Sequence, residues 1–220
     1  MWEAGIASSS EGSSVADSVP PRCKVGLKCA HCKKYRRRRK GLLDTREAIR
    51  SEFMRAYVRE RLDRITVKGL CVAVPVARTT FYAHYRNVDD VLLEVEDRLL
   101  AGLAEVAGRV SGGDLPNMDF QAFLDATLAY VDHNRTDFHA LLVVQPDARF
   151  VARWKDAMKA NMTRRYPQAR MHARWDLISE MGASAIVGAY VWWMGHPDAA
   201  GLDEVKQHVA RAVEAVMSTI

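Results

Sequence analysis

The sequence predicts an all-α protein, and three observations support this prediction. Apolar residues recur at spacings of three and four over almost every segment after residue 43. No alternating run of apolar and polar residues is long enough to build a sheet. Capping residues, glycines and prolines divide the chain into pieces of helical length. A chain of 220 residues can also bury a sizeable core.

The first 43 residues differ in composition from the rest. Ser, Gly and Ala dominate up to residue 18, and residues 35–40 read Tyr-Arg-Arg-Arg-Arg-Lys. Such a like-charged run in a segment with few apolar residues predicts a disordered basic tail over residues 1–43. The tail is either an arm that lies on DNA phosphates or a solubilising tail. A start codon assigned too far upstream would also explain it, so whether residues 1–43 belong to the native product stays open.

Three of the four cysteines lie in this tail. Cys23, Cys29, His31 and Cys32 could supply four zinc ligands, but His31 lies between two of the cysteines and the paired knuckles of a zinc module are missing. We therefore expect no metal and no cofactor, and metal binding by these residues stays an open alternative. The cysteines do not form an even, spread-out framework, and no signal-peptide pattern is present, so we expect a cytoplasmic protein.

Residues 44–62 predict the first helix of the folded part. Asp44 or Thr45 can cap it, and Ile49 and Phe53 begin an apolar stripe at helical spacing. This stripe would pack against the segment that follows.

Residues 66–85 predict two short helices joined by a tight turn. Thr66 can cap the first helix, because its hydroxyl can accept a hydrogen bond from a first-turn amide. Pro75 cannot continue that helix, which places the turn at residues 74–76. The second helix begins near Ala77 and carries polar side chains. Two helices in this arrangement form a helix-turn-helix, whose second helix fits the major groove of DNA.

This segment resembles the DNA-binding domain of the TetR family of bacterial transcriptional regulators. The resemblance rests on residues 65–67, on residues 76–85, and on Asn87 and the acidic pair that precede residues 91–93. It implies a DNA-binding domain over residues 44–90 and a helical ligand-binding and dimerisation domain over residues 91–220. It also implies a set of DNA contacts: Thr66, Tyr82 and His84 to phosphates, Arg78, Thr79 and Thr80 to bases, and Lys68 as a further DNA-binding residue.

Three positions depart from the family pattern. Pro75 replaces the usual turn glycine, Ala77 replaces the usual serine cap of the recognition helix, and Val88 replaces a lysine that often opens the next helix. A missing serine cap costs about 1 kcal/mol. A missing lysine removes one phosphate contact.

Charge divides the chain in the same way. The formal net charge is +5, with a basic excess in the N-terminal part and an acidic excess after residue 87. A basic N-terminal part suits a polyanion such as DNA.

The remaining segments predict further helices. They cover residues 87–109, 119–133, 138–144, 146–166, 181–194 and 202–220. The segment 181–194 carries no charge, yet it is shorter than the roughly 20 residues that span a bilayer, so we expect no membrane partner. We expect it to pair with the last helix and with their copies in a second subunit, forming a homodimer. The alternative is a monomer core.

Aromatic and methionine side chains of the C-terminal domain could line a pocket for a small apolar or aromatic effector. They are Trp154, Trp175, Trp192, Trp193, Met158 and Met162, with His133, His139 and His172 nearby in sequence. The alternative is that they are core residues.

The sequence contains no phosphate loop, nucleophile elbow or metalloprotease motif, so we expect no enzyme. It predicts a sequence-specific transcriptional regulator, effector-responsive and acting as a homodimer on a palindromic double-stranded DNA operator. The alternative is a TetR-like interaction protein with degenerate DNA binding, whose C-terminal domain docks a protein partner.

Overall fold

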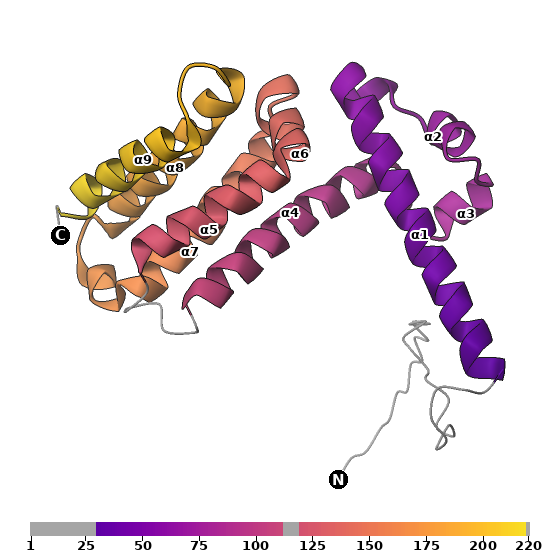
Figure 1. The fold of residues 1–220 in the computed structure, drawn as a ribbon, viewed down its shortest axis with the longest axis horizontal. Coiled ribbons are helices and arrows are strands. Elements are labelled where there is room, and N and C mark those ends of the chain that lie inside the picture. Colours follow the sequence, from indigo (N-terminus) through magenta and orange to yellow (C-terminus); the bar gives the residue numbers. More distant parts are fainter. Residues whose placement is uncertain (1–29, 112–118, 219–220) are drawn as a thin grey trace, which may run out of the picture. The chain divides into compact units, whose positions relative to one another are not determined.

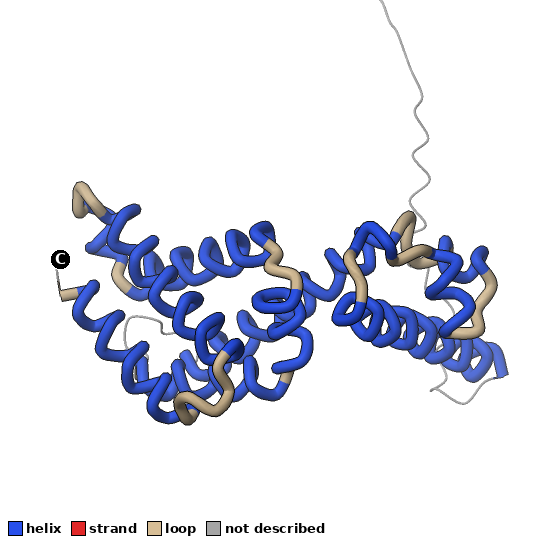
Figure 2. Tube along the Cα trace, turned by 90° about the horizontal axis from the view of Figure 1, so that it is seen from above, coloured by secondary structure: helices blue, strands red, loops and turns tan. Residues whose placement is uncertain are grey.

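The computed structural model describes residues 30–111 and 119–218, with side chains from Thr45 onward. Throughout these residues the regular structure is helical, and no strand is present (Figures 1 and 2). The predicted all-α class is therefore confirmed. The chain divides into two compact units, residues 1–44 and residues 45–220.

The helices follow one another with short connections. They are α1 (Ala30–Arg59), η1 (Leu62–Arg64), α2 (Val67–Ala73), α3 (Arg78–Tyr82), α4 (Val88–Ser111), α5 (Phe120–His133), α6 (Arg135–His139), η3 (Ala140–Val144), α7 (Ala148–Arg165), η4 (Pro167–Met171), α8 (Trp175–Gly195) and α9 (Leu202–Met217).

Helix α1 begins at Ala30, whereas the sequence predicted disorder up to residue 43 and a helix start at residue 44. The difference has a local reason, since lysine and arginine are good helix formers and no proline lies between residues 30 and 59. The rest of the predicted tail, including Cys23 and Cys29, lies outside the described residues.

The first three helices of the compact unit 45–220 share one small core. Ile49 and Phe53 of α1 are fully buried together with Phe81 of α3, and Leu70 of α2 is nearly so. Burying each such side chain stabilises the fold by about 1.5–3 kcal/mol. This core holds the two short helices in place, because helices of this length are not stable alone.

The helical body is built from α4 to α9. Helix α4 packs on α5, α7 packs on α8, and α8 packs on α9, which also touches α5 (Figure 1). An aromatic cluster fills its centre, with the Trp154 ring 5.2 Å from that of Phe138 and 5.6 Å from that of Tyr190. Helix α4 thus leads directly from the helix-turn-helix into the body.

Helices α4 and α5 approach closely at Gly102. A Cβ atom placed there would lie 2.0 Å from the Tyr130 hydroxyl oxygen. No other residue fits this position without moving Tyr130, so the glycine sets how near the two helices lie.

The predicted short helix over residues 138–144 is in fact two pieces. Helix α6 ends at His139, and a π-helical turn, η3, follows. The widened turn closes with hydrogen bonds from the Gln145 amide to Ala140 and from the Asp147 amide to Leu141, both 2.9 Å. Across the described residues, no helix is both long and apolar enough to cross a membrane.

Candidate DNA-binding surface and its link to the helical body

The predicted helix-turn-helix forms from α2, a turn and α3. The Thr66 hydroxyl caps α2 by accepting a hydrogen bond from the Gly69 amide at 3.1 Å, as expected from the sequence. The turn at residues 74–76 closes with a hydrogen bond of 3.0 Å from the Val76 amide to the Cys71 carbonyl. Phe81 anchors α3 from its inner side. The outer side of α3 is left to polar residues.

Pro75 has an unusual backbone conformation in this turn. Its φ angle is 23°, and it is the one non-glycine residue with positive φ in the described part of the chain. The proline ring favours φ near −65°. The turn therefore follows the left-handed path that a glycine would take without strain.

Most predicted DNA contacts lie at the protein surface. Thr66, Lys68, Arg78, Thr79 and Tyr82 are exposed, and the Tyr82 side chain is 57% accessible although its ring packs edge-on against Phe81. Thr80 is half-buried. The structure thus brings five of the seven predicted residues to the surface of one short motif.

In the part of the chain that the structure describes, the basic side chains of the helix-turn-helix are unpaired, whereas two of those on α1 form ion pairs. Lys68 and Arg78 form no ion pair within the described residues. By contrast, Arg46 and Arg50 of α1 donate to Glu94 of α4 at 2.5 and 2.6 Å. These two ion pairs join α1 to α4.

His84 differs from the other predicted contacts. Its ring is half-buried, and its Nε2 atom is buried without a hydrogen-bond partner. Burial, and secondarily the charge of Arg46, lower the pKa of His84 below its usual value. A neutral, half-buried imidazole offers less attraction to a phosphate than the exposed Arg78 does.

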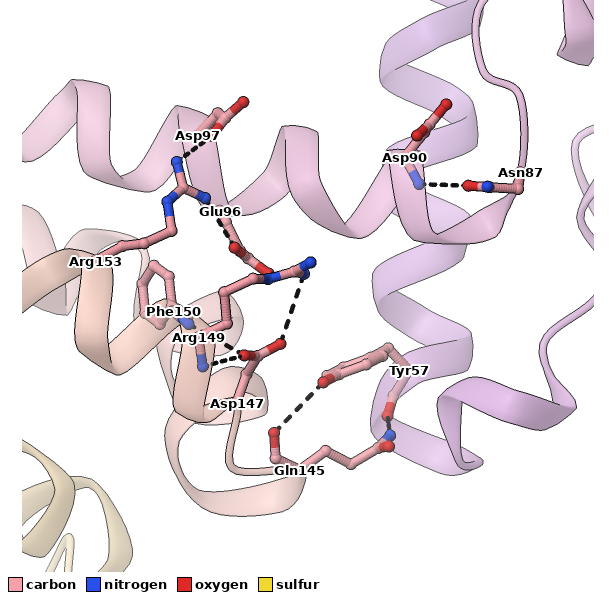
Figure 3. Close-up of polar contacts among 10 residues, drawn as sticks. All are labelled: Tyr57, Asn87, Asp90, Glu96, Asp97, Gln145, Asp147, Arg149, Phe150 and Arg153. Atoms are coloured by element: carbon pink, nitrogen blue, oxygen red, sulfur yellow. Dashed lines mark hydrogen bonds and ion pairs between the residues drawn. The ribbon is translucent and has the colours of Figure 1, made fainter.

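The start of α4 lacks the lysine of the family pattern but is well capped. The Asn87 side-chain oxygen accepts from the Asp90 amide at 2.9 Å (Figure 3) and so caps this helix. Asp90 in turn pairs with Arg86 at 2.9 Å, and this contact lowers the pKa of Asp90. Val88 itself is half-buried and packs on the core.

Gln145 connects the body to the end of α1. Its Nε2 donates to the carbonyl of Tyr57 (Figure 3) and, at 2.9 Å, to that of Glu60, while its Oε1 accepts from the Leu62 amide at 3.3 Å. The Tyr57 hydroxyl donates back to the Gln145 carbonyl at 3.4 Å. The last carbonyls of a helix have no hydrogen-bond partner within the helix. The Gln145 side-chain amide supplies a partner for two carbonyls at this end, those of Tyr57 and Glu60.

A buried carboxylate joins α4 to α7 beside this contact. Glu96 is fully buried and accepts from Arg149 at 2.5 Å and from Arg153 at 2.8 Å, and Arg153 also pairs with Asp97 (Figure 3). A buried charge must be paired to be tolerated, so Glu96 fixes the start of α7 on α4.

Sequence reasoning did not find Gln145 or Glu96. One signal was available for Glu96, because it lies between Val95 and Leu99 on the inward side of α4, where an acid needs a partner. Nothing local marks Gln145, whose partners are more than eighty residues away in sequence.

A cavity of about 180 Å³ lies in the body among α4, α5, α7, α8 and α9. Trp154, Met158 and Met162, three residues of the predicted effector pocket, line it together with Tyr190. The other predicted residues lie elsewhere: Trp175 and Trp193 are buried core residues, while Trp192 is exposed.

One face of α8 carries apolar and small residues that no other part of the described chain covers. Leu177, Met181, Ser184, Gly188 and Trp192 are exposed and follow one another at helical spacing. The neighbouring helices pack only on the other face of α8, where Ala183, Ile186 and Tyr190 are buried.

The residues described here hold no group of three or more metal-binding side chains. Cys71 is a buried thiol in the core of the motif. The possible zinc ligands Cys29, His31 and Cys32, like Cys23, lie outside the residues whose side chains are described.

Comparison with solved structures identifies proteins of the same fold. The dihydroxyacetone kinase operon activator DhaS aligns with a TM-score of 0.53 and 15% identity over 80% of this chain and 96% of that chain. A SmeT–triclosan complex aligns with a TM-score of 0.55 and 16% identity, covering 80% and 91%. A TetR-family transcriptional regulator from Streptomyces coelicolor aligns with a TM-score of 0.53 and 15% identity, covering 80% and 81%. No protein-family model and no curated protein matches the sequence. The chain therefore has the fold of TetR-family regulators.

Proposed function

We propose that the chain is a sequence-specific DNA-binding transcriptional regulator that acts as a homodimer and responds to a small effector. The exposed, unpaired Arg78 and Lys68 on a helix-turn-helix whose first helix, α2, is capped by Thr66 support this proposal best. Arginine can contact a guanine edge through two hydrogen bonds, and lysine can neutralise a phosphate. The neighbouring Thr66, Thr79 and Tyr82 hydroxyls are exposed and suited to phosphate and base contacts.

The experiment that tests DNA recognition is recovery of genomic fragments by the full chain, at physiological salt with competitor DNA. We expect a small set of related, palindromic fragments. Arg78→Ala should weaken binding to them about 5- to 150-fold, because one good base contact contributes about 1–3 kcal/mol of discrimination. Arg109→Ala is the matched control, since Arg109 is exposed on α4 and pairs with Glu105 away from the motif. Binding without sequence preference, unaffected by Arg78→Ala, would reject the proposal.

The uncovered face of α8 supports a homodimer. A second copy could cover Met181 and Trp192, and the open space around Gly188 would let two helices approach closely. Two recognition helices would then read half-sites about 34–36 Å, or a larger helical repeat, apart. Gly188→Arg should shift the chain to monomer in sedimentation experiments, whereas Gly201→Arg, in the loop before α9, should not.

Two connections support a link between effector and DNA. Helix α7 lines the cavity through Trp154 and Met158, and its first turns bind Glu96 of α4 through arginines. Directly before α7, Gln145 holds the end of α1. A ligand that moves α7 would therefore act on both helices that carry the DNA-binding motif.

Two observations favour the alternative of an interaction protein that has lost specific DNA binding. The strained turn at Pro75 and the uncapped start of α3 at Ala77 both weaken the motif. In that case residues 33–40 alone would carry salt-sensitive binding without sequence preference. Deleting them would then abolish DNA binding, whereas a specific reader would keep its selected fragments.

A further inference from the structure

The cavity in the body is small and mostly apolar. Its volume of about 180 Å³ is close to that of an apolar cavity of about 150 Å³ that holds one benzene molecule. Aromatic side chains form much of its wall, including Trp154 and Tyr190, which stack with their ring centroids 5.6 Å apart. The space therefore suits one aromatic ring with a small substituent.

Thr127 and Tyr190 place hydroxyl groups on the cavity wall. The Thr127 hydroxyl donates to the Phe123 carbonyl at 2.8 Å, so its one proton is already used within α5. The Tyr190 hydroxyl oxygen carries lone pairs that can accept a hydrogen bond from a ligand hydroxyl. Burial raises the pKa of Tyr190, so this phenol stays neutral.

The arginines at the rim are already engaged. Arg164 donates to the Asn161 side chain. Arg165 donates from Nε to the Tyr166 hydroxyl at 3.0 Å, and its guanidinium lies over the Phe120 ring at 5.8 Å. A ligand carboxylate would have to displace these contacts, and a charge deeper in the cavity would lose its hydration without a counter-ion.

We propose that this cavity binds an uncharged, single-ring aromatic compound with one hydroxyl group. The ring lies against the aromatic wall, and the ligand hydroxyl donates to the oxygen of Tyr190. The proposal rests on the proposed function, because it specifies the chemical class of the effector.

Calorimetric titration of the full chain with three matched compounds tests the proposal. The compounds are 4-ethylphenol, ethylbenzene and 4-ethylbenzoate, which share a ring and an ethyl group. We expect 4-ethylphenol to bind about tenfold more tightly than ethylbenzene, the ratio that one buried hydrogen bond provides. 4-Ethylbenzoate should bind most weakly. In Tyr190→Phe, which keeps the ring and loses the acceptor, 4-ethylphenol should fall to the affinity of ethylbenzene. Ala107→Leu narrows the cavity and should abolish binding of all three without lowering Tm.

Three outcomes would overturn the proposal: tightest binding of 4-ethylbenzoate, an unchanged preference for 4-ethylphenol in Tyr190→Phe, or no binding of any compound to the unmodified chain. These outcomes are separable from failure of the proposed function. Selective recovery of DNA fragments without binding of 4-ethylphenol would reject only the ligand class. Binding of 4-ethylphenol without selective recovery of DNA would reject only the regulator.

Discussion

Replacing Pro75 with glycine should stabilise the helix-turn-helix, although removing a proline from a loop usually destabilises a protein. The reason is the φ angle of 23° at this residue, roughly 90° away from the value near −65° that the proline ring favours. Glycine reaches positive φ without steric cost. The substitution keeps the path of the turn and removes the ring that opposes it.

Two opposing contributions set the magnitude. A residue held in a disfavoured backbone conformation costs about 1–3 kcal/mol, and a proline this far from its preferred φ belongs at the upper end. Replacing proline by glycine also gives the unfolded chain more freedom, which lowers stability by about 1–2 kcal/mol. The difference predicts that Pro75→Gly raises the free energy of unfolding by about 1 kcal/mol.

Urea unfolding at a fixed protein concentration measures this change, and amide exchange at Val76 reports it locally. Val76 donates to Cys71 across the turn, so its amide should exchange more slowly in the variant. The control is Pro197→Gly in the exposed loop between α8 and α9, where φ is not positive. In that variant the free energy of unfolding should fall by about 1–2 kcal/mol. Equal destabilisation by both substitutions would refute the strain at Pro75.

Three further predictions concern stability. Ala77→Ser should raise the free energy of unfolding in urea by about 1 kcal/mol, because Ala77 has the extended backbone of a cap residue and its side chain makes no cap hydrogen bond. No increase would mean that the first amides of α3 already have hydrogen-bond partners. Gly102→Ala should lower the free energy of unfolding by about 1–3 kcal/mol, because the new methyl group clashes with Tyr130. Gly108→Ala has open space around it and should be neutral or stabilising. Similar effects of the two substitutions would contradict the close approach of α4 and α5. Glu180 pairs with two lysines of α7, which lower its pKa from near 4.5 to about 2. The stabilisation of the fold by these ion pairs is therefore complete above about pH 5 and is lost as pH falls toward 2. The difference in the free energy of unfolding between the unmodified chain and Glu180→Gln should vanish over this range.

Local features of the fold followed from the sequence because they depend on neighbouring residues. The Thr66 cap and the turn at residues 74–76 each involve groups within five residues of one another. At this scale, side-chain chemistry and helix geometry leave few alternatives.

Features that depend on distant residues did not follow from the sequence. Gln145 reaches Tyr57 only because the π-helical turn before it directs the chain toward the end of α1. Glu96 is tolerated in the core only because Arg149 and Arg153 come from another helix. Periodicity cannot pair such residues, since it reports which face is buried and not what lies opposite.

The turn at Pro75 shows why a departure from the family pattern can leave the recognition surface unchanged. Leu70 and Phe81, on either side of the turn, are both nearly or fully buried, and burying each contributes about 1.5–3 kcal/mol. Together these contributions exceed the roughly 3 kcal/mol that a strained residue costs. Packing therefore sets the position of α3, and the turn adopts the required path whichever residue occupies it. Arg78 and Thr79 remain exposed on α3, so we expect the proline to reduce the stability of the motif more than its capacity to contact DNA.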